Sequence, residues 1–161
     1  MFLLIIKVVN QYSNILKIYF AAPLFSQAER KFNLDLTHQL EQIGYEVFLP
    51  QRDGAERDKP PYDKMSKEER RQTMFAIDRD QILSCDVFLF VLDGRVPDEG
   101  ACVELGIAYT QKYLEKNNKQ IIGLQTDVRA AFLGAKLNPM LKIPLEQIFD
   151  TEELLLNYLS K

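Results

Sequence analysis

The stretch "CDVFLFVLDG", residues 85–94, indicates the fold more clearly than any other part of the chain. Its centre, from Val87 to Leu92, is entirely apolar, which is typical of a strand buried on both faces of a sheet. Helical patterns flank it over about 67–84 and 99–114, and a further β-rich segment, "KQIIGLQT", follows at 119–126. Strands that alternate with helices of this length predict βαβ units and a mainly parallel sheet covered on both sides.

The other regular segments continue this alternation. Residues 16–21, "LKIYFA", and 45–50, "YEVFLP", are predicted strands, and a helix is predicted between them over about 27–43, with Ser26 as its N-cap. A last helix is expected near 151–159. The apolar spacing of the helix at 27–43 predicts one buried face, made of Ala28, Phe32, Leu36, Leu40 and Ile43.

Two segments lack a regular pattern. Residues 51–66 contain Gly54, Pro60 and Pro61 among mixed charges. We interpret this segment as a lid or binding loop, because a loop of that length in a compact domain is usually functional. The stretch around "AKLNPML", 135–141, is a second predicted loop.

The composition narrows the functional classes. With 47% apolar and 27% charged residues and a net charge of -3, the chain has the balance of a globular protein rather than of a disordered or membrane-spanning one. No basic run suggests a nucleic-acid polymer as partner. Cys85 and Cys102 lack metal-ligand spacing and His38 is the only histidine, which disfavours zinc, any other metal site and a cysteine-histidine nucleophile.

The length predicts one catalytic domain over residues 16–161. Residues 1–15 lie outside the alternating pattern and are interpreted as an extension of unknown role: an extra strand, an oligomer contact or a poorly ordered segment. Their apolar run is interrupted by Lys7 and lacks a basic start and a small-residue cleavage site. We therefore expect a cytoplasmic protein that does not enter a membrane.

Glu104 is the least expected charge in the sequence. It lies among apolar neighbours, and Gly100 and Ala108, at i-4 and i+4, leave space above it on the same helix face. One reading is a surface ion pair with an arginine. The other is a buried carboxylate beside a ligand, which requires a specific hydrogen-bond donor or a functional role because an unpartnered buried charge is costly.

Two further acids are predicted near the same crevice, where the carboxyl ends of parallel strands normally hold a ligand. Asp78 shares a helix side with Met74 and Ile82, and Asp98 precedes the helix that carries Glu104. The simplest role for Asp98 is to cap that helix. Several converging carboxylates without a thiol or histidine fit two-carboxylate chemistry at a glycosidic centre, in which one acid attacks and another protonates the leaving group.

Several motifs together resemble the nucleoside 2-deoxyribosyltransferase family: "KIYFAAPLFS", "LPQ", "AIDRDQILSCDVFLFVLDG", "PDEGACVELGIAY" and "LNPM". The resemblance runs from Lys17 to about Met140. It implies a flavodoxin-like three-layer α/β fold with a mainly parallel sheet of about five strands. It also implies an enzyme without a cofactor that exchanges the base of 2'-deoxyribonucleosides for a free nucleobase.

The resemblance also implies roles for individual residues. Glu104 matches the family's nucleophile, Tyr19 matches a tyrosine hydrogen-bonded to it, and Asp78 and Asp98 match acids that bind and protonate the base. Gly100 would leave room for the deoxyribose. The residues expected to hold the substrate are Phe25 by stacking, Gln51 by hydrogen bonds and, from a neighbouring subunit of a homo-oligomer, Asn138 and Met140. Asn138 and Met140 also fit an ordinary turn around Pro139, and Phe25 fits a core position.

Two alternatives stay open at the level of sequence. A 2'-deoxynucleoside 5'-monophosphate N-hydrolase would use the same glutamate and give the sugar to water, although its phosphate-binding first loop is not present in "APLFSQAER". A non-catalytic flavodoxin-like binding module is the second alternative. The chain also has Ala21-Ala22-Pro23 where family members often have Ala-Gly-Pro, which adds a methyl group near the ligand.

Overall fold

The computed structural model describes residues 15–55, 57, 59–129 and 136–161, so the predicted extension lies outside the described residues except for Ile15. Its five strands are β1 (Lys17–Ala21), β2 (Glu46–Phe48), β3 (Val87–Val91), β4 (Gln120–Leu124) and β5 (Gln147–Phe149). They form one sheet in the order β2-β1-β3-β4-β5, with every pair parallel. The predicted α/β fold with a parallel sheet of about five strands is therefore confirmed.

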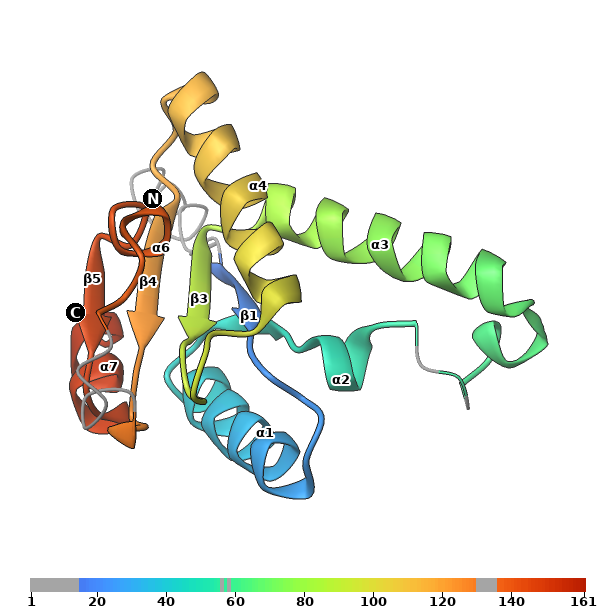
Figure 1. Cartoon of the computed structure of the whole chain (residues 1–161), viewed down its shortest axis with the longest axis horizontal. Helices are drawn as coiled ribbons and strands as arrows, with labels where there is room; N and C mark the ends of the chain where they lie inside the picture. Colours follow the sequence, from blue (N-terminus) through green and yellow to red (C-terminus); the bar gives the residue numbers. More distant parts are fainter. Residues whose placement is uncertain (1–14, 56, 58, 130–135) are drawn as a thin grey trace, which may run out of the picture.

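The helices of the described chain are α1 (Gln27–Gln42), α2 (Pro50–Asp53), α3 (Lys67–Ser84), α4 (Glu99–Glu115), α6 (Pro139–Lys142) and α7 (Glu152–Leu159), with a 3-10 turn η1 (Tyr62–Lys64). α1 and α7 cover one face of the sheet (Figure 1). α4 and the C-terminal end of α3 cover the other. No described helix is long and apolar enough to cross a membrane.

β3 explains why the decisive stretch is apolar throughout. Val87, Leu89 and Val91 face the core under α1 and α7, whereas Phe88 and Phe90 face the core under α3 and α4. All five side chains are at most 2% exposed. Complete burial of each such side chain stabilises the fold by roughly 1.5–3 kcal/mol.

The structure corrects three expectations about local structure. The buried stripe of α1 consists of Asn33, Leu36, Thr37 and Leu40, while Ala28 and Ile43 are exposed. The segment after β2 is not a continuous loop, because α2 begins at Pro50 and η1 follows. The predicted loop around 135–141 contains the start of α6, capped by the Asn138 side chain.

β5 had no counterpart among the strands identified from the sequence. It has only three residues, and its exposed Gln147 interrupts any apolar run. Its parallel pairing with β4 completes the sheet.

α3 differs from the other long helices because most of it extends away from the sheet (Figure 1). Of its 18 residues, only Ile82 is fully buried. A capping box formed by Ser66 and Glu69 holds its first turn. The segment containing α2 and η1 runs out beside it, so this part of the chain forms an arm next to the carboxyl ends of the strands.

Candidate active site

The centre of the site is a hydrogen bond between β1 and α4. The hydroxyl of Tyr19 donates to Oε1 of Glu104 at 2.8 Å. The Tyr19 ring is fully buried and stacks between Phe48 of β2 and Phe88 of β3, with both centroid distances at 5.7 Å. Because these neighbours hold the ring, its hydroxyl is a fixed donor that orients one oxygen of Glu104 and leaves Oε2 for a ligand.

Glu104 lines a cleft of about 220 Å³ together with Asp78 from α3 and Asp98 from the start of α4. Asp98 caps α4 as predicted, since its Oδ1 accepts from the backbone N–H of Ala101 at 2.8 Å. Oδ1 of Asp78 is buried and has no hydrogen-bond partner within the described ranges. The fold thus brings the three predicted acids to one cavity, where the buried Oδ1 of Asp78 has no protein donor among the described residues.

Burial raises the pKa of two of these acids, Asp78 and Glu104. Desolvation raises the pKa of Asp78 to about 6. Desolvation also raises the pKa of Glu104 to about 7; the hydrogen bond from Tyr19 lowers it, and the charges of Asp78 and Asp98 raise it. Because both values lie near neutrality, the cluster can hold a proton on one carboxyl while another is ionised, which is what acid-base chemistry requires.

The pKa of Tyr19 is raised, first by desolvation and then by the charges of Glu104 and Asp78. Tyr19 therefore stays protonated and acts as a donor, not as a proton acceptor.

Apolar groups form the remaining walls of the cleft, which are Ala22, Leu24, Phe25, Pro50, Gly54, Ala55 and Met74. The Phe25 side chain is 77% exposed, so the alternative of a core position for it is wrong. An exposed aromatic ring at the cleft is suited to stacking on a planar ligand. Ala22, at a position where glycine would leave more room, is itself part of the wall.

Gln51 is near the cleft but does not line it. Its Nε2 donates to the backbone carbonyl of Arg30 at 2.7 Å, and its Oε1 accepts from Asn33 at 3.1 Å. Asn33, 2% exposed, also donates to the carbonyl of Pro23. These bonds tie the first loop, α1 and α2 together. Asn33 was not identified from the sequence, although a polar residue three positions before Leu36 on the buried stripe is a signal for such a role.

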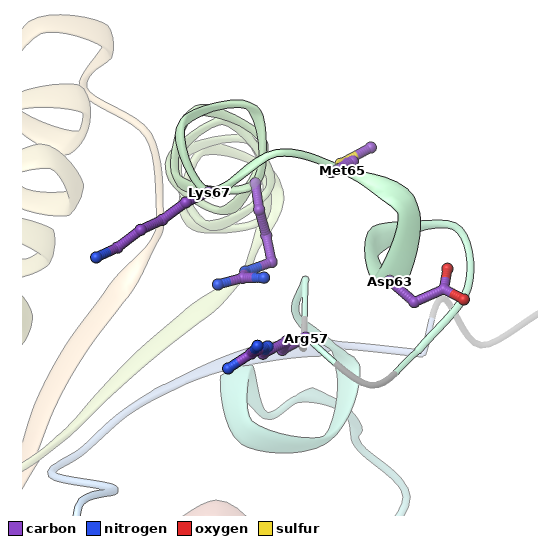
Figure 2. Close-up of a pocket in the computed structure, with 5 residues that line it drawn as sticks. Arg57, Asp63, Met65 and Lys67 are labelled. Carbon is purple, nitrogen blue, oxygen red and sulfur yellow. The ribbon is translucent and has the colours of Figure 1, made fainter.

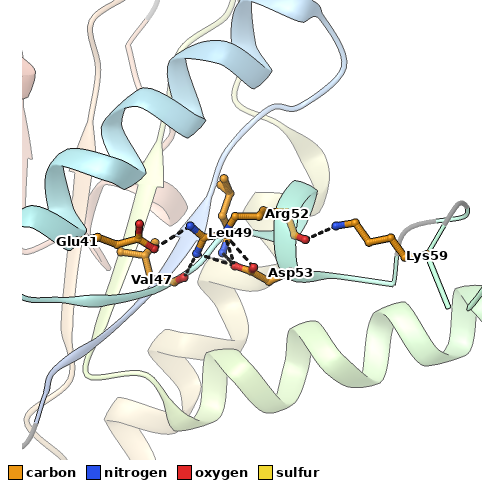
Figure 3. Close-up of polar contacts among 6 residues, drawn as sticks. All are labelled: Glu41, Val47, Leu49, Arg52, Asp53 and Lys59. Carbon is orange, nitrogen blue, oxygen red and sulfur yellow. Dashed lines mark hydrogen bonds and ion pairs between the residues drawn. The ribbon is translucent and has the colours of Figure 1, made fainter. Parts of the chain in front are cut away.

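A second polar network fixes α2 (Figure 3). The Arg52 guanidinium bonds Glu41 and the carbonyl of Val47, each at 2.7 Å, and pairs with Asp53. Asp53 in turn accepts from the backbone N–H of Leu49. These contacts hold the short helix whose far end supplies Gly54 and Ala55 to the cleft.

Gly54 is required by a close approach of the backbone. A Cβ at this position would lie 2.5 Å from the carbonyl oxygen of Pro50, which is much closer than real Cβ contacts. Only glycine lets α2 end here without displacing the wall that faces Asp78.

The other predicted substrate contacts lie outside the cleft lining. Gly100 is in the first turn of α4, where a Cβ would be 3.1 Å from Oδ1 of Asp98, so it makes room for that carboxylate. Asn138 accepts from the N–H of Met140 at 2.9 Å, and the Met140 side chain is 78% exposed. The described residues include no group of three or more His, Cys, Asp or Glu side chains that could hold a metal ion.

Several solved structures have an architecture similar to that of this chain. The chain is similar to a conserved protein from Enterococcus faecalis V583, with 28% identity, TM-score 0.66 and coverage of 90% of this chain and 97% of that one. It is also similar to a 2-deoxyribosyltransferase from the psychrotolerant bacterium Bacillus psychrosaccharolyticus, with 24% identity, TM-score 0.69 and coverage of 88% and 91%. A CMP N-glycosidase from Clostridium botulinum shares the fold, at 22% identity, TM-score 0.52 and coverage of 89% and 96%.

No curated protein matches the chain. A family model described as nucleoside 2-deoxyribosyltransferase matches residues 18–158, which include the whole cleft from Ala22 to Glu104. The chain therefore belongs to the nucleoside 2-deoxyribosyltransferase family.

Proposed function

We propose that this protein transfers 2-deoxyribose between nucleobases by a retaining double displacement through a deoxyribosyl-Glu104 intermediate. One observation supports this most directly. Glu104 is held by the buried hydroxyl of Tyr19 through Oε1 and shares its cleft with two further carboxyls. The same cleft therefore contains an oriented carboxylate for attack and separate acids for proton transfer.

In the first step, Oε2 of Glu104 attacks C1' of the nucleoside. The C1'–N bond breaks, and the leaving base takes both the bonding electrons and a proton from Asp78 or Asp98. In the second step, the same acid, now a carboxylate, removes a proton from the incoming base while the base nitrogen attacks C1' and releases Glu104. Two inversions at C1' retain the stereochemistry. A 2'-hydroxyl would destabilise the oxocarbenium-like transition state, so the chemistry favours 2-deoxyribose.

Hydrogen bonding supports this assignment. The Tyr19 hydroxyl donates to Glu104 and favours its ionised form, whereas Oδ1 of Asp78 is buried without a partner among the described residues. A base nitrogen placed against Asp78 would give that carboxyl its missing partner. Phe25 at the cleft would stack on the plane of the base.

We further propose that the active enzyme is a homo-oligomer in which Asn138 and Met140 of one copy complete the cleft of another. Within its own chain the Met140 side chain is almost fully exposed and away from the cleft lining. The exposed side chains of Leu83, Val103 and Leu114, with the partly buried Ile107, line a groove of about 520 Å³ over α3 and α4 that a second copy could cover. Sedimentation velocity of the unmodified protein tests this and should show a species larger than the monomer. Met140→Asp should lose base-exchange activity while its circular dichroism spectrum stays the same.

The deciding experiment is chromatography of products from 2'-deoxyinosine and free adenine. We expect 2'-deoxyadenosine from the unmodified protein and none from Glu104→Gln. Glu99→Gln is the matched control, because Glu99 is an exposed acid in the first turn of the same helix. Hypoxanthine with free deoxyribose and no new nucleoside would instead show the N-hydrolase activity. No reaction, even with pyrimidine donors and nucleotides, would favour a binding module.

The roles of the acids are tested by leaving-group dependence. Asp78→Asn and Asp98→Asn should slow transfer from ordinary bases by about 10²-fold or more and transfer from activated bases far less, because proton donation is the lost function. Equal slowing for both kinds of base would contradict proton donation.

A further inference from the structure

Two walls of the catalytic cleft come from short segments between the larger elements. The first is the loop between β1 and α1, and the second is α2 with the two residues after it. Their lining residues are Ala22, Leu24, Phe25, Pro50, Gly54 and Ala55. Because neither segment is a strand of the sheet, the separation of the two walls depends on contacts outside the sheet.

One side-chain amide joins these two walls. Asn33, on the buried side of α1, donates through Nδ2 to the carbonyl oxygen of Pro23 at 2.9 Å and to Oε1 of Gln51 at 3.1 Å. Pro23 lies between two cleft-lining residues of the loop, and Gln51 directly follows Pro50 in α2. A primary amide has two hydrogens to donate. Asn33 therefore uses one of them on each wall.

The Gln51 amide extends this network back to α1. Its Nε2 donates to the backbone carbonyl of Arg30 at 2.7 Å, so both ends of the amide are bonded to α1. Asn33 is almost completely buried and does not line the cleft. Loss of its Nδ2 would leave the Pro23 carbonyl and Gln51 Oε1 without this donor, which is costly where water cannot replace it. Asn33 can therefore influence a ligand only through the walls that it holds.

The far end of the second wall borders open space. Two residues beyond Ala55, the chain reaches a hollow of about 650 Å³ lined by Arg57, Asp63, Met65, Lys67 and Arg70. Figure 2 shows Arg57 on one side of this hollow and Lys67, the first residue of α3, on the other. Because this space separates that end of the wall from the start of α3, the position of the wall depends on the bonds between α2 and α1.

We propose that Asn33 is a positioning residue for the nucleobase. Its two hydrogen bonds set the separation between the loop that carries Phe25 and α2, and thereby how tightly a base is held in the cleft. The identity of the ligand as a nucleobase rests on the proposed function. Small displacements of positioning groups are known to weaken binding and catalysis strongly, even when the altered residue does not touch the ligand.

The expected effect is a loss of base affinity with little change in the chemical step. Tyr19 holds Glu104 across β1 and α4, apart from the bonds of Asn33. Asn33→Leu should therefore raise KM for adenine as acceptor by about tenfold, equivalent to ~1.4 kcal/mol, and change kcat by less than about threefold. The acid limb of the pH-rate profile should stay in place, because the bond between Tyr19 and Glu104 is intact.

The test combines steady-state kinetics with isothermal titration of adenine. Thr37→Val is the matched control, because Thr37 lies one turn along the same buried stripe and its Oγ1 has no partner among the described residues. It should keep both KM and the adenine dissociation constant. Gln51→Leu should also raise KM, and its combination with Asn33→Leu should add little, because both substitutions break the same bond. If Asn33→Leu does not fold by circular dichroism, the smaller Asn33→Ser takes its place.

The other outcomes separate this inference from the proposed function. If adenine binds, Asn33→Leu weakens that binding and Thr37→Val does not, but no base exchange occurs, the role of Asn33 stands and the proposed function fails. If Thr37→Val raises KM as much as Asn33→Leu, general packing of α1 explains the effect and the inference is overturned. A fall in kcat with unchanged KM, additive effects of Asn33→Leu and Gln51→Leu, or no binding of adenine to the unmodified protein would each overturn it as well.

Discussion

Buried polar groups at the two ends of the central strands differ in whether the protein supplies their hydrogen-bond partners. At the amino end, Lys119 is 4% exposed, and its Nζ donates to the carbonyls of Ile82 and Cys85 and contacts the Cys85 sulfur at 3.3 Å. At the carboxyl end, Glu104 has one protein donor and Oδ1 of Asp78 has none within the described chain. The first arrangement is complete without a ligand. The second becomes complete only when something enters the cleft.

The polar contacts at the amino end contribute to stability, whereas the carboxyls at the other end lower it and are available to a ligand. The Lys119 ammonium neutralises the carbonyls at the C-terminal end of α3, where the helix dipole is negative. At the carboxyl end, burial instead raises the pKa values of Asp78 and Glu104, which lowers stability at neutral pH.

The largest effect is expected from Glu104→Gln. Loss of the attacking oxygen anion should lower kcat for base exchange by about 10⁴-fold or more, as removal of a nucleophile usually does. The melting temperature at pH 8 should stay the same or rise, because a buried carboxylate is replaced by a neutral amide of the same shape. Steady-state kinetics and calorimetry check both points. More than a hundredth of the original kcat would rule out Glu104 as nucleophile.

Lys119→Met tests whether the polar contacts at the amino end of the strands contribute to stability alone. Removing the Lys119 amino group takes the buried donor from the Cys85 carbonyl and leaves the Ile82 carbonyl with only the weak Cys85 thiol donor, so the free energy of unfolding should fall by about 3 kcal/mol. The kcat per folded molecule should not change, because Lys119 lies at the other end of the strands. Urea unfolding and active-site-normalised kinetics measure the two quantities. A parallel fall in kcat would mean that the two ends are coupled.

Tyr19→Phe sharpens the description of the catalytic end. The hydroxyl lowers the pKa of Glu104, so its loss should move the acid limb of the pH-rate profile to higher pH. The kcat at pH 7 should fall by about 10- to 100-fold, because less Glu104 is ionised and its rotamer is no longer fixed. A pH-rate series compares the variant with the unmodified enzyme. A uniform fall without a shift of the limb would point to misplacement of the ring instead.

The sequence predicted the cluster of acids at the carboxyl end of the strands better than the buried lysine at the amino end. Glu104 is conspicuous because a charge among apolar residues beside Gly100 has few structural explanations. Lys119 has the opposite appearance, since a lysine in "NNKQ" reads as an exposed turn residue. Only the packing of α3 against the start of β4 buries it. Long-range burial of this kind leaves no local pattern.

Elements of the fold likewise differ in whether a local sequence pattern predicts them. The apolar run of β3 and the lengths of α3 and α4 predicted the parallel sheet, because both are local and periodic signals. β5 and α2 are too short for a period, and α2 depends on partners such as Glu41 that are distant in sequence. The contributions of Gln51 and Asn33 likewise depend on a tertiary contact between α1 and α2.

The smallest effect expected here is on the pH dependence of stability. Burial raises the pKa of Asp78 to about 6 in the folded protein, above its ordinary value of 3.8. A carboxyl with a raised folded-state pKa binds its proton more tightly when folded, so its contribution to stability is full below about pH 4 and is lost as the pH rises through 6. Asp78→Asn should therefore increase the free energy of unfolding by about 1–2 kcal/mol at pH 8 and leave it nearly unchanged at pH 4. Asp80→Asn, on the same helix but exposed and paired with Arg79, is the control and should show no such dependence. Urea unfolding at both pH values measures the difference, and a pH-independent effect of Asp78→Asn would mean that burial does not raise the pKa of Asp78 in the folded protein.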